Sequence, residues 1–417
     1  MAILAGCYPK RVNREDFVRL LTTEAQQLLN QVGDLDAKAD VVKLVSSLRA
    51  AGHDAGLVAA VLSQAKLRRR ARAKFGEFAD SMLFTEAGLE QASRLKVAAL
   101  HAGRYRAAGI KDVADLGCGI GAESLALASL ELRVHAFELD EVTAAAATYN
   151  LAPFANASVE LADVTELDLS KFESLFFDPA RRELHGAARA KAVRKFDPAE
   201  FSPNFDWVVE QALQRPTGIK LGPGHPHEAI PESDEVEIEA QWVSVAGDLV
   251  ELGLWFGSLA RPGLKRSALL IDADGRHHEF NSSDLAGSHA TLGELGEYLH
   301  EPDNAIVRSH LIGPLADELG LRGFAPEIAY LTSDEPIESP WLRSYRVLDS
   351  MPFDRKKLKS YLRERGIGVL EIKKRGADIV PETLRKELQL KGENAATLVV
   401  TRVGDAHRAI IAEAIQR

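Results

Sequence analysis

A glycine-rich turn between two apolar segments constrains this chain more than any other feature of its sequence. Residues 113–116 form a short, mostly apolar run typical of a buried strand, residues 117–121 read GCGIG, and residues 123–132 are rich in the helix formers Ala and Leu. Residues 133–139, which alternate apolar and polar side chains over most of their length, follow and complete a strand, a turn, a helix and a second strand. In such a unit the turn and the start of the helix present backbone N–H groups to a ligand at the carboxyl end of the strands. We therefore expect a nucleotide-like ligand at this turn.

The identity of that ligand depends on Asp115. Gly117, Gly119 and Ala122 also fit the dinucleotide-binding pattern, in which Glu138, about 20 residues further on, would bind a ribose hydroxyl. An acidic residue two positions before the first glycine would repel a pyrophosphate, whereas it suits a ligand with a cationic amine. S-adenosylmethionine carries such an amine, a sulfonium and a ribose. A nicotinamide-dependent dehydrogenase is the alternative.

Four short segments follow one another as the motifs of a known enzyme family do. They read DLGCGIG at 115–121, FELD at 137–140, LADV at 161–164 and FFDPA at 176–180. In these segments the chain resembles the class I S-adenosylmethionine-dependent methyltransferases. The resemblance implies an α/β fold with a Rossmann-like sheet of seven strands, and S-adenosylmethionine as the cofactor.

The resemblance also implies roles for residues at the strand ends. Three glycines would let the backbone approach the cofactor: Gly117, Gly119 and Gly121. Asp115 would reach the cofactor's amine. Glu138 would accept hydrogen bonds from both ribose hydroxyls, because an ionised carboxylate has two acceptor oxygens, and Asp163 would accept one from the adenine amino group.

A segment before the glycine turn is a further candidate for the cofactor site. Thr85 is suited to cap a helix that runs through His101. Similar segments in some nucleic-acid methyltransferases close over the cofactor, and Phe84 and Thr85 would do so here. The alternative is an ordinary helix cap beside a packing aromatic.

The predicted catalytic segment begins at Asp178. In amino-directed methyltransferases an Asp/Asn-Pro-Pro-aromatic motif holds an exocyclic amine through a side-chain oxygen and a backbone carbonyl, and its aromatic residue stacks on the base. Asp178 and Pro179 match this motif, whereas Ala180 replaces the second proline and Arg181 the aromatic residue. A guanidinium plane can stack on a base or pair with phosphate, so we include Arg181 among the predicted catalytic residues. An ion pair with a nearby carboxylate is the alternative for Arg181 and Arg182.

The length of the chain, 417 residues, predicts more than one domain. We predict an N-terminal helical module at 1–108, the methyltransferase domain at 109–285, and an α+β domain at 286–417. The methyltransferase domain should end in a hairpin that turns at residues 246–247. In the stretches LEIKKRG at 370–376 and TLVVTRV at 397–403, the C-terminal part resembles the THUMP-like domain of a group of bacterial class I methyltransferases.

Because THUMP domains proper bind RNA in tRNA-modifying enzymes, this resemblance points to RNA. The net charge of −10 argues against a protein that coats nucleic acid nonspecifically. Basic runs nevertheless occur at 66–74 and, as a pair of short segments, at 355–359 and 373–375. Each run could equally be a solvated helix face. Our hypothesis is a methyltransferase that modifies a base amine in tRNA or rRNA. The alternatives are a small-molecule methyltransferase and a noncatalytic RNA-binding protein with a relic cofactor fold.

Composition bears on the compartment and on metals. The two cysteines cannot form a disulfide framework, no apolar run reaches roughly 18 residues, and the first residues do not resemble a signal peptide, so we expect a cytoplasmic protein without a membrane segment. Amine methylation requires no metal, and we predict none. His225 and His227 lie in the sequence GPGHPH, which we interpret as a surface loop rather than a metal site.

Overall fold

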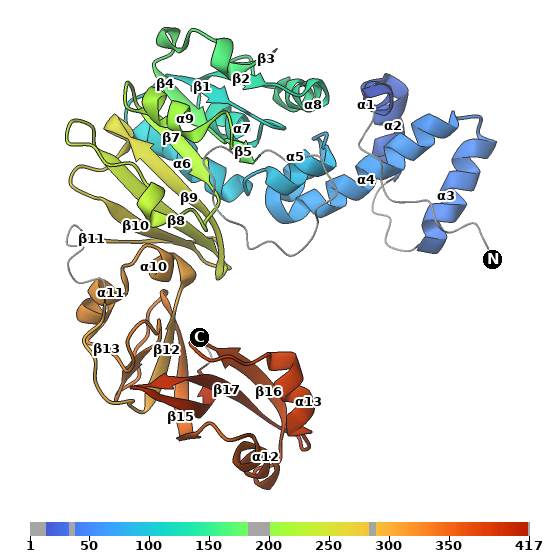
Figure 1. Ribbon diagram of the computed structural model, residues 1–417. Coiled ribbons are helices and arrows are strands. Elements are labelled where there is room, and N and C mark those ends of the chain that lie inside the picture. Colours follow the sequence, from blue (N-terminus) through green and yellow to red (C-terminus); the bar gives the residue numbers. More distant parts are fainter. Residues whose placement is uncertain (1–13, 33–37, 182–200, 283–288, 416–417) are drawn as a thin grey trace. The chain divides into compact units, whose positions relative to one another are not determined.

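The computed structural model describes residues 14–32, 38–181, 201–282 and 289–415 (Figure 1). The chain divides into two compact units. Unit 1 comprises Met1–Lys220 with Trp255–Leu259, and unit 2 comprises Leu221–Leu254 with Ala260–Arg417. The three domains predicted from the sequence, with boundaries after residues 108 and 285, stay a prediction.

Unit 1 begins with helices, as the sequence predicts. They are α1 (Arg14–Leu20), α2 (Thr23–Val32), α3 (Lys38–Ala50), α4 (Ala55–Phe75), α5 (Glu86–Gln91) and α6 (Leu95–Ala107). The single helix predicted from Thr85 through His101 is wrong, because residues 92–94 separate α5 from α6. The Lys74 ammonium explains the break, since it binds the carbonyl groups of Leu89, Glu90 and Ala92 at the end of α5.

A parallel sheet forms the centre of unit 1. Its strands are β1 (Asp112–Leu116), β2 (Arg133–Glu138), β3 (Ala157–Leu161), β4 (Ser174–Phe177) and β7 (Thr217–Leu221), in the order β7-β4-β1-β2-β3. Helices α7 (Ala122–Ser129), α8 (Glu141–Leu151) and α9 (Phe205–Ala212) lie in the connections between them (Figure 1). The chain order reverses between β1 and β4. α/β sheets of this type bind ligands at such a switch point, outside the carboxyl ends of the strands.

Close packing fixes β4 against β7. The Tyr105 hydroxyl donates a hydrogen bond to the Leu175 carbonyl (2.5 Å) and accepts one from the Gly218 N–H (2.9 Å). A Cβ on Gly218 would lie 2.8 Å from Trp255 and from that hydroxyl, so only glycine permits this approach. The packing therefore sets the positions of the residues that follow on these two strands, Asp178 and Lys220.

Unit 2 begins with two hairpins, both at predicted places. Strands β8 (Ile238–Val245) and β9 (Asp248–Phe256) are joined at Ala246 and Gly247, which both have positive φ. Strands β10 (Arg266–Ile271) and β11 (His277–Ser282) pair in antiparallel fashion, and β10 pairs in parallel with β8. Strands β8 and β9 are the sixth and seventh of the seven predicted strands, and all seven form. The hairpin of β10 and β11 adds two more.

The C-terminal part of unit 2 has the predicted α+β pattern. Its sheet has the order β13-β14-β12-β15-β18-β17-β16. These strands are β12 (Tyr298–Pro302), β13 (Arg322–Gly323), β14 (Leu331–Ser333), β15 (Leu342–Pro352), β16 (Ile367–Lys374), β17 (Asn394–Val403) and β18 (Ala406–Ala414). Its helices are α10 (Asn304–Arg308), α11 (Ile312–Leu319), α12 (Arg355–Glu364) and α13 (Pro381–Leu388). Leucines of α12 and α13 pack into one apolar core with β16, β17 and β18. Within the described ranges, no helix has the length and apolar character needed to cross a membrane.

Candidate cofactor and catalytic site

The glycine turn connects β1 to α7, as predicted. Gly117, Gly119 and Gly121 have φ values of 91°, 56° and 85°, which glycine adopts at little cost. A Cβ on Gly117 would lie 3.5 Å from the backbone oxygen of Asp178. The turn therefore lies beside the end of β4, so two of the predicted motifs meet at one edge of the sheet.

Asp115 is fully buried beneath this turn. Its Oδ2 accepts a hydrogen bond from the Ser124 hydroxyl (2.5 Å), whereas its Oδ1 has no hydrogen-bond partner among the described residues. Burial raises the pKa of Asp115 to about 7, and the nearby Glu123 and Asp178 carboxylates add to the increase. A buried carboxylate oxygen without a donor is a group that a ligand amine would satisfy. The residue thus fits the predicted contact with the amine of S-adenosylmethionine.

Glu138 ends β2 and binds the glycine turn directly. Its Oε2 accepts a hydrogen bond from the Gly119 N–H (3.0 Å), and its Oε1 accepts one from the Asp140 N–H (2.9 Å). Burial raises its pKa. Each carboxylate oxygen has a second lone pair, so both can still accept bonds from ribose hydroxyls.

Asp163, at the end of β3, is exposed and serves as a helix cap. Its Oδ1 accepts hydrogen bonds from the Thr165 hydroxyl (2.7 Å) and N–H (2.9 Å), and these bonds lower the pKa of the carboxyl. The capping role accounts for one carboxylate oxygen. The Asp163 Oδ2 would accept the hydrogen bond from the adenine amino group, and this role stays a prediction.

Phe84 and Thr85 have structural roles in the segment before α5. The Phe84 ring is buried, with its centroid 5.5 Å from that of Phe75. The Thr85 hydroxyl caps α5 by accepting a hydrogen bond from the Gly88 N–H (2.9 Å). A Cβ on Gly88 would lie 2.4 Å from Ile120 in the glycine turn. The start of α5 therefore packs on the turn, whereas contact of Phe84 or Thr85 with the cofactor stays a prediction.

Asn150 ties that segment to the turn, a role that the sequence analysis missed. Its amide donates hydrogen bonds to the carbonyls of Leu83 (3.0 Å) and Ile120 (2.9 Å), and its Oδ1 accepts one from the Leu83 N–H (2.7 Å). Its signal in the sequence is faint, because it is one polar residue near the end of the alanine-rich helix α8.

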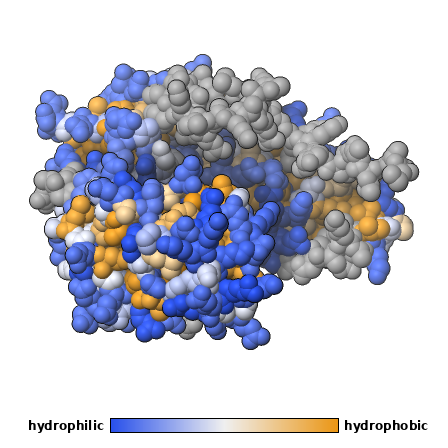
Figure 2. Space-filling view, turned by 60° about the horizontal axis from the view of Figure 1, so that its bottom comes forward, coloured by the Kyte–Doolittle hydropathy of each residue, from blue (hydrophilic) through white to orange (hydrophobic). Residues whose placement is uncertain are grey.

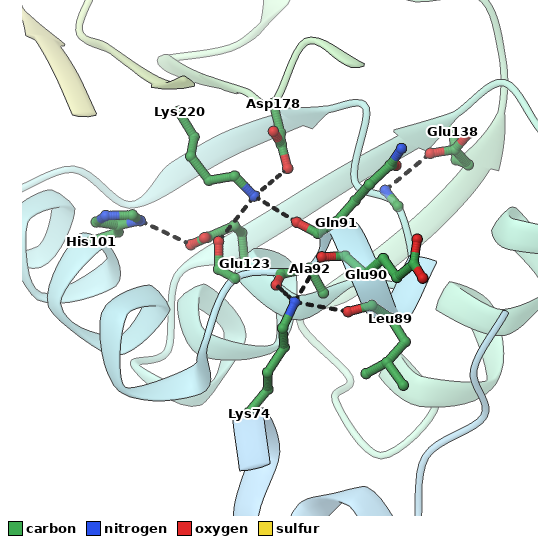
Figure 3. A network of polar contacts seen from close by, with 12 residues as sticks. Lys74, Leu89, Glu90, Gln91, Ala92, His101, Glu123, Glu138, Asp178 and Lys220 are labelled. Atoms are coloured by element: carbon green, nitrogen blue, oxygen red, sulfur yellow. Dashed lines mark hydrogen bonds and ion pairs between the residues drawn. The ribbon is translucent and has the colours of Figure 1, made fainter. Parts of the chain in front are cut away.

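Asp178 forms an ion pair with Lys220 at the carboxyl ends of β4 and β7 (Figure 3). The Lys220 Nζ lies 2.5 Å from the Asp178 Oδ2, and it also donates hydrogen bonds to the Gln91 carbonyl (3.2 Å) and the Ser93 hydroxyl (3.1 Å). The Lys220 side chain is 11% exposed and that of Asp178 30%. The predicted catalytic carboxylate is thus held at the carboxyl end of β4 by a nearly buried ammonium group.

The other two predicted catalytic residues follow Asp178. Pro179 is buried directly after it. The backbone of Arg181 lies in β5 (Ala180–Arg181), which pairs with β6 (Phe201–Ser202). The Arg181 side chain and the whole of Arg182 lie outside what the structure describes, so their roles stay predictions.

A buried pair, His101 with Glu123, lies next to these residues and was not predicted. The His101 Nδ1 lies 3.3 Å from the Glu123 Oε2 (Figure 3). Burial alone would raise the pKa of Glu123, but His101 and Lys220 outweigh it and the net shift is downward. Glu123 is therefore a buried carboxylate that His101 and Lys220 stabilise.

The basic run at 66–74 makes internal contacts on α4. Arg68 donates to the Met82 carbonyl (2.8 Å), Arg70 pairs with Glu86, and Arg72 pairs with Asp80. Burial and repulsion from Lys220 lower the pKa of Lys74 to about 8. These contacts join α4 to residues 80–86, the segment that leads into α5.

A cavity of about 680 Å³ lies at the other edge of the sheet. It is lined by residues near the amino ends of β1, β2 and β3, among them Lys111, Arg133 and Asn156. Because open α/β sheets bind their ligands at the carboxyl ends of the strands, we still expect the cofactor at the glycine turn. Among the described residues no group of three or more His, Cys, Asp or Glu side chains could hold a metal ion.

The fold and the motifs that meet at the glycine turn define a class I methyltransferase. Two proteins of Mycobacterium tuberculosis, from strains CDC 1551 / Oshkosh and ATCC 25618 / H37Rv, are each described as an uncharacterised S-adenosylmethionine-dependent methyltransferase. Each is 33% identical to this chain over 345 residues, which is 81% of this chain and 91% of theirs. The chain belongs to this family of S-adenosylmethionine-dependent methyltransferases, so the predicted enzyme class and cofactor are confirmed.

Two further comparisons agree with the fold. The crystal structure of a candidate methyltransferase from Porphyromonas gingivalis W83 matches with a TM-score of 0.70 at 20% identity, over 97% of this chain and 99% of that one. The family model of a THUMP domain-like region matches residues 342–414, as predicted for the C-terminal part. Residues 13–71 match a domain of unknown function, DUF8688.

We expect Glu138→Ala to weaken S-adenosylmethionine binding about 10- to 100-fold, because a charged acceptor of hydrogen bonds contributes about 1.5–3 kcal/mol. Calorimetric titration would measure the affinity. Glu160→Ala is a matched control, since Glu160 is an exposed carboxylate on the neighbouring strand β3, and it should leave the affinity unchanged. An unaltered affinity in a folded Glu138→Ala protein would refute the ribose role.

Proposed function

We propose that this enzyme transfers the methyl group of S-adenosylmethionine to an amine of a base in RNA, either tRNA or rRNA. The observation that carries the proposal is the position of Asp178 and Pro179, which follow β4 next to the glycine turn. A carboxylate and a backbone carbonyl at this place suit an amine as the methyl acceptor. RNA is proposed because the THUMP domain-like match covers residues 342–414.

The residues at the carboxyl ends of the strands would have separate roles. The cofactor supplies an electrophilic methyl group on its sulfonium. Asp115 would bind the cofactor's amine, and Glu138 its ribose. Asp178 would accept a hydrogen bond from the acceptor amine and so direct the nitrogen lone pair, while Lys220 holds the carboxylate in place. Methyl transfer depends mostly on approach distance and alignment, which is what a carboxylate held by an ion pair provides.

One observation favours a small-molecule acceptor as the second candidate. The C-terminal basic residues are partly neutralised within unit 2, because Lys373 pairs with Glu301 (2.7 Å) and Arg355 with Glu387 (3.2 Å). Apolar side chains are exposed in the same region, at Val369 and Val380. The face seen in Figure 2 likewise has hydrophobic patches among hydrophilic residues. Such a mixed surface is less suited to a phosphate backbone than a continuous basic one.

Methyl transfer from labelled S-adenosylmethionine would test the proposal. The purified protein would be given total RNA in one reaction and an RNA-free small-molecule extract in another. We expect label in the RNA, with the modified nucleoside identified after digestion, and calorimetric binding of S-adenosylmethionine but not of NADH. Label in the small-molecule extract alone would favour the second candidate. Binding of RNA without label in either fraction would favour a relic cofactor fold.

A further inference from the structure

A cluster of basic side chains lies in unit 2, apart from the residues of the proposed site. Its members come from the 222–227 loop, from β10 and from α10 with the residues just after it. They are His225, His227, Arg266, Arg308 and His310. The prediction that the 222–227 sequence forms a surface loop is wrong at His225, which is 1% exposed. The Arg308 guanidinium explains this burial, because its Nη2 donates a hydrogen bond to the His225 carbonyl (3.1 Å).

The rings of the cluster are stacked. The His227 ring lies over Trp242 with its centroid 5.0 Å away, and over His310 with its centroid 3.9 Å away. The Arg266 Nη1 is 3.1 Å from the His310 Nδ1. A guanidinium only donates hydrogen bonds, so this nitrogen accepts, and the exposed His310 carries its own proton on Nε2. The ring is therefore a neutral donor at the surface.

The two arginines of the cluster lack carboxylate partners. Neither Arg266 nor Arg308 forms an ion pair with a residue in the described ranges, and the Arg308 Nε is buried without a hydrogen-bond partner. By contrast, Arg261 in the same unit pairs with Glu239 (2.5 Å) and Glu279 (2.6 Å). Half-buried guanidinium groups are usually paired in this way, because an uncompensated charge is costly to desolvate.

The charges around the cluster point to a missing anion. Burial lowers the pKa of His227 to about 4, with further repulsion from His310, Arg266 and Arg308. Burial and the same arginines, with His289, lower the pKa of His310. Burial lowers the pKa of Arg266, and the charge of Glu232 acts in the opposite direction. One carboxylate at longer range does not balance two guanidinium groups, so a bound anion would relieve the repulsion.

We propose that Arg266, Arg308 and His310 form a binding site for a phosphate group, with His227 beside it. Arg266 already donates from Nη1 to His310 and Arg308 from Nη2 to His225. The fork of Nε and Nη2 on Arg266, the Nη1 of Arg308 and the imidazole N–H of His310 are the donors left for a tetrahedral anion. The phosphate could belong to an RNA backbone or to a free phosphate or nucleotide. The proposal does not depend on methyl transfer, since none of these residues belongs to the site at the glycine turn.

A titration of the full chain with inorganic phosphate would test this site. Calorimetry would measure the affinity, and the imidazole signals in NMR would report on the histidines. We expect phosphate to raise the apparent pKa of His310, and we expect Arg266→Ala and Arg308→Ala each to weaken phosphate binding about 10-fold or more. Arg276→Ala is the matched control, because Arg276 is exposed in the turn that follows β10. Arg266→Lys keeps the charge but loses the fork, and it should also bind less tightly. Thermal unfolding would verify that each variant is folded.

Competition with a single-stranded RNA oligonucleotide would distinguish the two possible sources of the phosphate. Displacement of phosphate by the RNA would assign the site to an RNA backbone. Phosphate binding that the RNA does not disturb would assign it to free phosphate or a nucleotide. The site does not exist if wild-type protein shows no phosphate effect, or if Arg276→Ala loses as much affinity as Arg266→Ala.

Discussion

Asp178→Ala should lower the rate of methyl transfer at least about 100-fold while S-adenosylmethionine binds with nearly unchanged affinity. The carboxylate lies at the end of β4, where it would hold the acceptor amine. Its partner Lys220 comes from β7 and not from β1 or β2, which carry the predicted cofactor-binding carboxylates. Removal of the side chain therefore affects the acceptor and not the cofactor. Labelled methyl transfer to the identified acceptor and calorimetric titration with the cofactor would measure the two quantities separately.

Two further variants sharpen this test. Asp178→Asn keeps an oxygen that accepts a hydrogen bond, so it should retain more activity than Asp178→Ala. Asp168→Ala is the control, because Asp168 is an exposed carboxylate that caps the short helix Leu169–Lys171 just before β4. It should be fully active. Full turnover by Asp178→Ala would show that the catalytic assignment is mistaken.

The parts of the site that the sequence predicted are local. The glycine turn, Asp115 and Glu138 lie on one strand–turn–helix–strand unit, so their spacing alone brings them to the same edge of the sheet. The hairpin at Ala246 and Gly247 is equally local, because the turn is made by two adjacent residues with positive φ, which Gly247 adopts at little cost.

Lys220 was expected near the substrate pocket, but its pairing with Asp178 and that of His101 with Glu123 were missed, because each joins residues far apart in the chain. Lys220 follows Asp178 by 42 positions, and Glu123 follows His101 by 22. A sequence shows that these residues are ionisable, but only the packing of β4, β7 and α6 shows that they meet. The break between α5 and α6 is similar, since its cause is the Lys74 ammonium on α4 and not a helix breaker in the segment itself.

His225 shows how composition can mislead. A loop of Pro, Gly and His is usually solvated. Here Arg308, which is 83 positions further on, binds the loop's backbone, and His225 is buried as a result. The basic run on α4 is a related case, because its charges make internal contacts that a count of charges cannot reveal.

Asp115 should make both stability and cofactor affinity depend on pH, in opposite directions. Its pKa is about 7 in the folded protein and 3.8 for an ordinary aspartate. Between these values the folded state binds more protons than the unfolded chain, so the free energy of unfolding should fall as pH rises through this window and level off above about 7. Cofactor binding should strengthen over the upper part of the same window, because the ionised carboxylate is the form that binds an amine.

Asp115→Asn separates these two effects. An amide cannot ionise, so the variant should be more stable than the wild type at pH 8, by about 1–4 kcal/mol, and should lose the pH dependence. It should also bind S-adenosylmethionine about 10- to 100-fold more weakly at pH 8, since a hydrogen bond to a charged group contributes about 1.5–3 kcal/mol. Denaturant unfolding and calorimetry at pH 5, 6, 7 and 8 would measure both, with Asp168→Asn as the exposed control. A less stable Asp115→Asn protein with full cofactor affinity would show that the carboxylate serves the fold, whereas a gain in stability with a loss of affinity is expected of a buried charge kept for a ligand.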